Sequence, residues 1–143
     1  MRDCDFCGIV RGEQPAQIVY ETGTVLAFLP LNAVAPGHTL VIPRLHTPDF
    51  LSCPAPLAGA LSAAAAHVGR AVRAAVAADG MNLITSAGAA ASQTVFHLHV
   101  HLVPRWDGDA LGRLWPLPSA ATSGPDAAVA GQIRRSLASL TPP

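Results

Sequence analysis

The sequence predicts an α+β fold built on a five-stranded antiparallel sheet, with one long helix and short flanking helices. Three observations lead to this class. Short runs of β-branched and aromatic residues alternate with turn residues, one long stretch has helical periodicity, and further β-rich runs follow that stretch. Strands before and after a single long helix favour an antiparallel sheet that carries its helices on one side.

Three strands are predicted before the long helix. The runs AQIVYET at 16–22 and TVLAFLPL at 24–31 are split by a turn at Gly23, which is typical of a hairpin. The run HTLVIP at 38–43 is the third strand. Pro43 ends it, because proline cannot continue a central strand.

Residues 55–78 form the predicted long helix, since their apolar side chains recur every three or four positions. These apolar positions are Leu57, Leu61, Ala64, Val68, Val72 and Val76. Two further strands follow, DGMNLITS at 79–86 and TVFHLHVHLVP at 94–104.

The whole chain, 1–143, is predicted to form a single domain, because its length is that of one domain. Residues 106–125 are rich in Gly, Pro and Ser, which predicts a loop. The segment 126–140 then has the period of a C-terminal helix. Its apolar face would consist of Val129, Ile133, Leu137 and Leu140.

Charge and composition exclude several classes of protein. The nine basic residues, all arginine, balance nine acidic ones, whereas a surface that binds nucleic acid normally has a basic excess. The first residues are charged and lack an apolar signal segment, and the alanine-rich stretch 55–66 is too short to span a membrane. We therefore expect a cytoplasmic protein whose partners include neither nucleic acid nor a membrane.

The stretch FHLHVHLVPR at 96–105 holds half of the six histidines in the chain. Its strict alternation predicts a strand with two different faces, because successive side chains on a strand point to opposite sides. Leu98, Val100 and Leu102 would face the core, and His97, His99 and His101 would share the other face. We expect this second face to carry the chemistry.

Three uses of these histidines are open. They could be solvated side chains, although three copies of an uncommon residue at strict alternation disfavour this. They could bind one metal ion, but the outer two lie about 13 Å apart along a strand, so at most two can share it. One imidazole could instead be a covalent nucleophile whose neighbour supports the leaving group.

The stretch HLHVHLV at 97–103 matches the pattern His-x-His-x-His-x-x, with x apolar, and resembles the signature of the histidine triad (HIT) superfamily. The segment APGHTLVIPRLH at 35–46 looks like the second signature of that family. CDFCGIVRGEQPAQIVYET, VLAFLPLNAV and DGMNLITSAG also resemble bacterial members in the same order. The resemblance covers residues 4–105, the predicted catalytic core, and implies a HIT-like fold.

Members of this superfamily are nucleotidyl hydrolases and transferases, in which the middle histidine attacks the α-phosphorus of a nucleotide ester, anhydride or phosphoramidate. The resemblance makes His99 this nucleophile, with His101 on the phosphate oxygens and the leaving group and His38 in a supporting role. Gln93 and Thr94 match positions that contact phosphate and leaving group. Fixed donors of this kind stabilise the charge that develops on the phosphoryl oxygens.

The N-terminal CDFC has Cys-x-x-Cys spacing, which by itself fits a redox pair, a chance pair or half of a zinc site. In many bacterial members of the superfamily such a pair joins two histidines around a structural zinc. The matching positions are Cys4, Cys7, His46 and His97, a closed Cys₂His₂ set. The resemblance thus implies structural Zn²⁺ and no organic cofactor. Cys53 is interpreted as a small apolar residue in a loop.

Two positions differ from the family pattern. Pro30, in FLPLN, stands where a side chain normally accepts the ribose hydroxyls, and proline has no such acceptor. Ser86, in ITSAG, stands where Asn or Gln usually contacts phosphate. We expect Ser86 to bind phosphate with a shorter reach, and either Asn32 or a backbone group to replace the ribose contact. The alternative is a non-standard nucleotide or another phosphate ester.

The sequence therefore predicts an enzyme that hydrolyses nucleotide phosphoramidates or phosphoanhydrides through a nucleotidyl intermediate on His99. One alternative is a nucleotidyl transferase or phosphorylase that uses an acceptor other than water. Another is a nucleotide-binding protein with negligible turnover. The resemblance also implies a homodimer with a small-molecule nucleotide, or a related phosphate ester, as its ligand.

Overall fold

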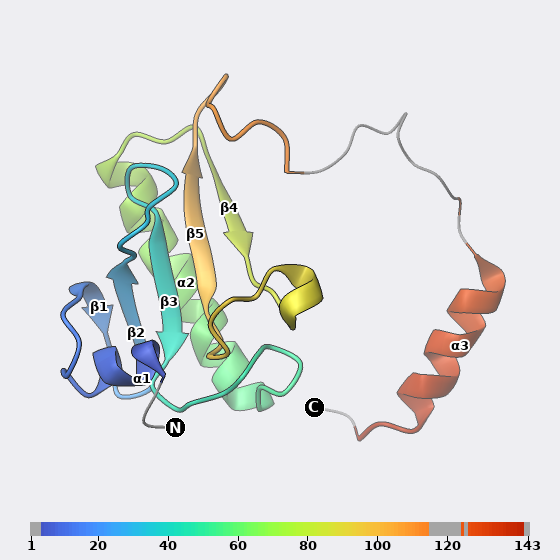
Figure 1. The fold of residues 1–143 in the computed structure, drawn as a ribbon. Coiled ribbons are helices and arrows are strands. Elements are labelled where there is room, and N and C mark those ends of the chain that lie inside the picture. The colour runs from blue at the N-terminus through green and yellow to red at the C-terminus, as the bar shows by residue number, and fades with distance from the viewer. Residues whose placement is uncertain (1–3, 115–123, 125, 142–143) are drawn as a thin grey trace. The chain divides into compact units, whose positions relative to one another are not determined.

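The computed structural model describes residues 4–114, 124 and 126–141 (Figure 1). Its elements in chain order are α1 (Asp5–Val10), β1 (Gln17–Glu21), β2 (Val25–Leu29), β3 (Thr39–Pro43), α2 (Ala55–Ala75), β4 (Gly80–Ile84), the 3-10 turn η1 (Ala89–Ala91), β5 (Val100–Arg105) and α3 (Ala127–Ala138). The chain divides into two compact units, Met1–Asp109 and Ala110–Pro143, and the sheet lies in the first. That the whole chain acts as one domain stays a prediction.

The five strands form one antiparallel sheet in the order β1-β2-β3-β5-β4, which confirms the predicted fold class. At the predicted hairpin between β1 and β2, the N–H of Thr22 donates to the carbonyl of Val25 at 2.9 Å. In β5, His101 pairs with Leu40 of β3 and with Ile84 of β4. The third histidine of the row therefore lies in the interior of the sheet, held by a strand on each side.

Both faces of the sheet are covered. Val25 and Ala27 of β2 join the core cluster that contains α2, whereas Leu26 and Phe28 of the same strand pack against Phe6 of α1. The prediction that the helices lie on one side is therefore wrong, because α1 and α2 cover opposite faces (Figure 1). The physical reason is visible in β2 and β3, which are nearly continuous apolar runs, and such strands are buried on both faces.

The fifth strand is shorter than predicted. We expected it over 94–104, but β5 begins only at Val100. Before that point the N–H of Leu98 donates to the carbonyl of Thr47 at 2.6 Å, so this segment bonds to the loop that follows β3 rather than to a ladder. The alternation of faces persists through the irregular part, since Leu98, like Leu102, is fully buried in the core.

The long helix α2 follows the predicted apolar pattern. It begins after Pro54, with a proline in its first turn, where a missing N–H has no intrahelical partner to lose. Its buried residues are Leu61, Ala64, Ala65 and Val68, which pack on the sheet. Within the described part of the chain, no helix is long and apolar enough to cross a membrane.

Gly37 forms the turn that leads into β3. Its φ is +77°, a conformation that side chains disfavour, and a Cβ there would lie 3.0 Å from Cγ1 of Val76 and 3.1 Å from Cγ1 of Val72. Glycine therefore lets the chain turn against the C-terminal end of α2. The next residue, His38, is buried at the start of the strand.

The helix α3 confirms the predicted C-terminal helix. The carboxylate of Asp126 accepts hydrogen bonds from the N–H groups of Ala128 and Val129, which caps the first turn. The predicted apolar positions, Val129, Ile133, Leu137 and Leu140, are exposed. Part of the predicted loop at 106–125 lies outside the described residues.

Candidate active site and metal centre

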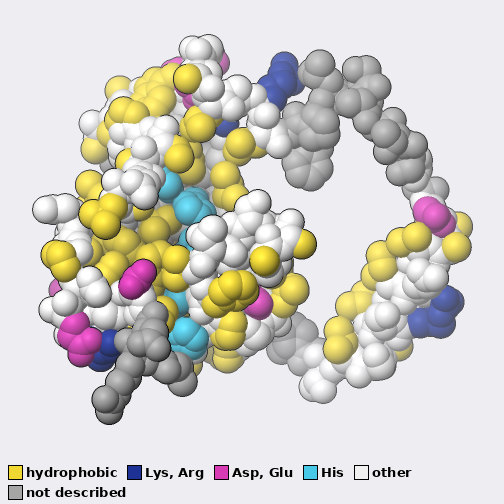
Figure 2. All heavy atoms as spheres, in the orientation of Figure 1, with side chains coloured by type: hydrophobic (Ala, Val, Ile, Leu, Met, Phe, Trp, Pro, Cys, Tyr) yellow, Lys and Arg dark blue, Asp and Glu magenta, His cyan; other side chains and the backbone are white. Residues whose placement is uncertain are grey.

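The three clustered histidines lie at the start of β5. His101 belongs to the strand, and His97 and His99 precede it. His97 and His99 are buried, whereas His101 is half-buried. Figure 2 shows histidine side chains along the middle of the sheet-containing unit, between apolar side chains. The three histidines are thus sheltered from solvent and are not solvated side chains on an open face of the strand.

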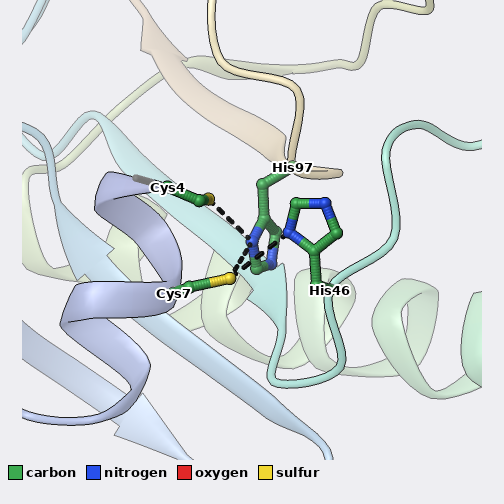
Figure 3. A group of neighbouring side chains, drawn as sticks. All are labelled: Cys4, Cys7, His46 and His97. Atoms are coloured by element: carbon green, nitrogen blue, oxygen red, sulfur yellow. Dashed lines mark hydrogen bonds between the residues drawn. The ribbon is translucent and has the colours of Figure 1, made fainter. Parts of the chain in front are cut away.

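Cys4, Cys7, His46 and His97 converge on one point. Their ligand atoms all lie within 4.8 Å of one another, and they form a group of possible metal ligands within the described residues. Figure 3 shows both cysteines, from the start of α1, pointing toward the two imidazole rings. Three chain segments that are distant in sequence meet here: the N-terminal helix, the loop after β3 and the segment before β5.

The distances in this cluster fit a tetrahedral zinc site. The sulfur of Cys7 lies 3.3 Å from Nδ1 of His46 and 3.5 Å from Nδ1 of His97, and the sulfur of Cys4 lies 3.5 Å from the same His97 nitrogen. In a tetrahedral site with the usual Zn–S and Zn–N bonds, sulfur and nitrogen ligands are about 3.5 Å apart. The donor set and its spacing therefore suit the ion.

The ring of His97 is oriented for metal binding. Its Nε2–H donates to the carbonyl of Pro43 at 2.9 Å, which leaves the lone pair of Nδ1 directed at the two sulfurs. Such an outer hydrogen bond fixes the tautomer of a metal-binding histidine. Burial lowers the pKa of His97 and raises the pKa of the Cys7 thiol, so without an ion both groups are held neutral.

In His99 the proton lies on the other ring nitrogen, Nδ1. Its Nδ1–H donates to the carbonyl of His97 at 2.7 Å, so the lone pair lies on Nε2. The carbonyl of His99 itself accepts from the hydroxyl of Thr85 at 2.9 Å. Thr85 directly follows β4 and was not among the residues selected from the sequence. A hydroxyl next to the end of a strand gives no distinguishing pattern, so only the fold reveals its contact.

A second chain of hydrogen bonds fixes His38 and His101. The N–H of Val34 donates to Nδ1 of His38 at 3.2 Å, so the proton of His38 is on Nε2. That Nε2–H donates to Nδ1 of His101 at 2.9 Å, and the two rings are stacked. The remaining proton of His101 is therefore on its Nε2. Val34, like Thr85, was not identified from the sequence.

Burial keeps His101 neutral. Together with smaller effects of the neighbouring His99 and His38, burial lowers the pKa of His101 to about 4. Burial also lowers the pKa of His38. The rings of His99 and His101 lie 5.0 Å apart at 73°. Side by side, the site thus offers an imidazole lone pair on His99 and an imidazole N–H on His101.

The other residues predicted for the site differ in their exposure and in their bonding. Gln93 is buried; its amide donates to the carbonyls of Pro48 and Val95 and accepts from the N–H of Gly88. Gln93 therefore orders the loop that carries Thr94, and its direct contact with phosphate stays a prediction.

Thr94 and Asn32 are exposed, and Ser86 and Pro30 are half-buried. Thr94 leads into the histidine row, Ser86 follows Thr85 at the end of β4, and Pro30 and Asn32 follow β2. The roles of the hydroxyl and amide groups at these loop positions stay predictions.

Comparison with known proteins agrees with this geometry. The HIT domain model matches residues 11–108. Adenylylsulfatase HINT3 of Arabidopsis thaliana is 38% identical over 109 residues, which cover 76% of this chain and 55% of that protein. The chain thus spans about half the length of this relative.

Two solved structures share the fold. The crystal structure of a member of the HIT family from Bacillus subtilis superposes with a TM-score of 0.82 at 34% identity, over 99% of both chains. A Zn-bound histidine triad family protein from Mycobacterium smegmatis gives a TM-score of 0.74 at 38% identity, over 94% of this chain and 92% of that one. Since the family model covers most of the sheet-containing unit and the folds agree, this chain belongs to the HIT domain family.

Proposed function

We propose that this protein hydrolyses nucleotide phosphoramidates or phosphoanhydrides through a covalent intermediate on His99. The observation that carries the proposal is the 2.7 Å hydrogen bond from Nδ1 of His99 to the carbonyl of His97, because it leaves Nε2 free to attack. Family membership supports a nucleotide substrate, and so does the name adenylylsulfatase of the Arabidopsis thaliana relative.

In the first step Nε2 of His99 attacks the α-phosphorus. A P–N bond forms, the bond to the leaving group breaks, and the leaving group takes the electron pair; an amine leaving group also takes a proton from the solvent. The ring becomes an imidazolium that keeps its Nδ1 proton, and the carbonyl of His97 stabilises this charge. Water then attacks the phosphorus, the P–N bond breaks, the nucleotide leaves as a monophosphate and the water loses a proton to solvent.

His101 acts in this scheme as a hydrogen-bond donor. With a pKa of about 4 it is neutral near pH 7, so its Nε2–H stabilises a phosphate oxygen or the leaving group without giving up its proton. His38 maintains this tautomer. Thr94, Ser86 and the loop ordered by Gln93 would complete the phosphate contacts.

The cluster of Cys4, Cys7, His46 and His97 would hold a structural zinc. When bound, the ion supplies a cross-link between three chain segments and takes no part in the reaction. Around it, the residues of this chain tie α1 to the segment that carries His99. The homodimer and the cytoplasmic location predicted from the sequence stay predictions.

Replacing the nucleophile should abolish turnover. We expect His99→Ala to lower kcat on adenosine phosphoramidate by about a thousandfold while substrate binding stays within a few-fold, because the nucleophile acts in the transition state. His67→Ala, at an exposed histidine of α2, is the matched control and should leave kcat unchanged. An adduct on His99 should be trapped by rapid quenching without acid.

More than a tenth of wild-type activity in His99→Ala would show that His99 is not the nucleophile. Product formed only with an added acceptor would identify a transferase. Binding without product, for a phosphoramidate and a dinucleoside polyphosphate alike, would identify a nucleotide-binding protein.

The metal cluster predicts both metal content and stability. Purified protein should contain about one equivalent of zinc, and Cys7→Ser should lower the zinc content and the melting temperature together, because binding energy at such a site is partly folding energy. Cys53→Ser changes a half-buried cysteine outside the cluster and should keep the zinc. Elemental analysis checks both variants, and metal-free wild type from a chelator-free purification would refute the site.

If neither Asn32 nor a backbone group replaces the acceptor that Pro30 lacks, the protein should recognise ribose weakly. A ribose hydroxyl without its charged acceptor loses about 1.5–3 kcal/mol, or about ten- to a hundredfold in kcat/KM. Pro30→Asp should therefore raise the preference for adenosine phosphoramidate over its 2′,3′-dideoxy analogue. Pro30→Ala should not, and Pro30→Asn separates the effect of charge from that of the freed backbone. A hundredfold ribose preference in wild type would show that another group already holds the hydroxyls.

The neutral state of His101 predicts how stability depends on pH. Unfolded His101 binds a proton as the pH falls below about 6.5, whereas folded His101 does so only near pH 4. The free energy of unfolding should therefore decrease as the pH falls through this window. Urea unfolding of wild type and His101→Asn checks this, because the variant should have the shallower slope. Equal slopes would mean that His101 is not held neutral.

A further inference from the structure

An aromatic side chain of α1 contacts both His97, a residue of the metal cluster, and His99, the proposed nucleophile. Phe6 lies between Cys4 and Cys7 in the helix, and its ring packs nearly perpendicular to that of His99, with centroids 5.4 Å apart at 86°. The same ring packs against His97 at 5.9 Å and 69°. No step of the proposed reaction uses Phe6.

Phe6 is held in place by a contact with the sheet. Its ring meets Phe28 of β2 at 5.5 Å and 74°, and Phe28 is only 3% exposed. Edge-to-face pairs of this kind have preferred geometry, so a ring held on one side transmits orientation to the ring on its other side. The position of His99 therefore depends on where α1 places Phe6.

The nucleophile has a specific need for such a contact. The torsion that turns an imidazole ring about its own axis is broad and roughly two-fold, so sterics of the side chain alone do not choose between the two orientations. Half a turn of His99 would exchange Nε2 for a carbon atom and break the bond to the carbonyl of His97. Among the residues that the structure describes, Phe6 and His101 are the rings that pack against His99.

The helix that carries Phe6 cannot hold its place alone. α1 has six residues and its N-cap, Cys4, makes no side-chain capping bond, whereas isolated helices this short are unstable in water. Two sets of contacts hold it: apolar packing of Phe6, Ile9 and Val10 on the sheet, and the approach of Cys4 and Cys7 to the two histidines. The second set of contacts lies within the cluster that would bind zinc.

We propose that Phe6 is a positioning residue for His99, and that through Phe6 the metal cluster sets the fraction of molecules whose nucleophile is correctly oriented. The proposal rests on the proposed function in two respects, namely that His99 is the nucleophile and that the cluster holds a metal ion. Loss of the ion would loosen α1, withdraw Phe6 and leave the ring of His99 free to turn. Metal loading would thus affect the chemical step as well as stability.

The test compares Phe6→Leu with Ile9→Ala. Both variants remove packing of α1 on the same face of the sheet, but Ile9 has no ring contact with a histidine. In Phe6→Leu we expect kcat to fall about two- to tenfold, the equilibrium weight of one aromatic contact, with KM and zinc content within twofold of wild type. In Ile9→Ala kcat should stay within twofold of wild type, even if the melting temperature of this variant falls as far as that of Phe6→Leu. Phe6→Tyr, which keeps the ring, should restore kcat.

A second readout does not depend on activity. The side-chain ¹⁵N signals of His99 should show one tautomer and one environment in wild type, and exchange-broadened or doubled signals in Phe6→Leu. Chelation of the metal should produce the same change in wild type and little further change in Phe6→Leu, because both act through one contact.

Identical kcat and identical His99 signals in Phe6→Leu and Ile9→Ala would overturn the proposal. If His99→Ala kept its activity, the proposed function would fall, but the His99 signals would still report whether Phe6 orients the ring. The two failures are therefore distinguishable.

Discussion

The site depends on hydrogen bonds between imidazole rings and the backbone. The carbonyl of Pro43 holds the proton of His97 on Nε2, and the carbonyl of His97 holds the proton of His99 on Nδ1. Two histidines one residue apart thus present opposite nitrogens and serve different purposes. The N–H of Val34 does the same for His38, which then sets His101. Because backbone groups are rigid and uncharged, these tautomers are fixed without a buried carboxylate.

The pairing of β3 with β5 brings these groups together. β3 begins beside His38, ends at Pro43 and leads to His46, while β5 carries His101 and continues the segment that holds His97 and His99. This antiparallel ladder places His38 next to His101, and it brings the loop after β3 to the segment before β5, where His46 and His97 meet. The apolar side chains of both strands pack against helices, with α2 on one face of the sheet and α1 on the other, so the ladder is buried on both faces. Burial in turn lowers the pKa of His38, His97 and His101.

Much of this could be predicted from the sequence, because period-two and period-3.6 patterns carry the strands, α2 and the two faces of the histidine row. The convergence of Cys4, Cys7, His46 and His97 followed from the family resemblance. The start of β5 and the position of α1 could not be predicted, since a short helix without capping depends on tertiary contacts. The bonds of Thr85 and Gln93 leave no pattern in sequence at all.

The four residues of the metal cluster are translated at different times, which leaves the first of them exposed in the growing chain. Cys4 leaves the ribosome first, and its partner His97 follows 93 residues later. At about 5–20 residues per second, that interval lasts about 5–20 seconds. During this time both N-terminal thiols lack their final partners and are open to oxidation and to foreign metals. Correct assembly of this site is therefore a matter of timing as well as affinity, and slower translation or an oxidising cell would lower the yield of correctly assembled protein.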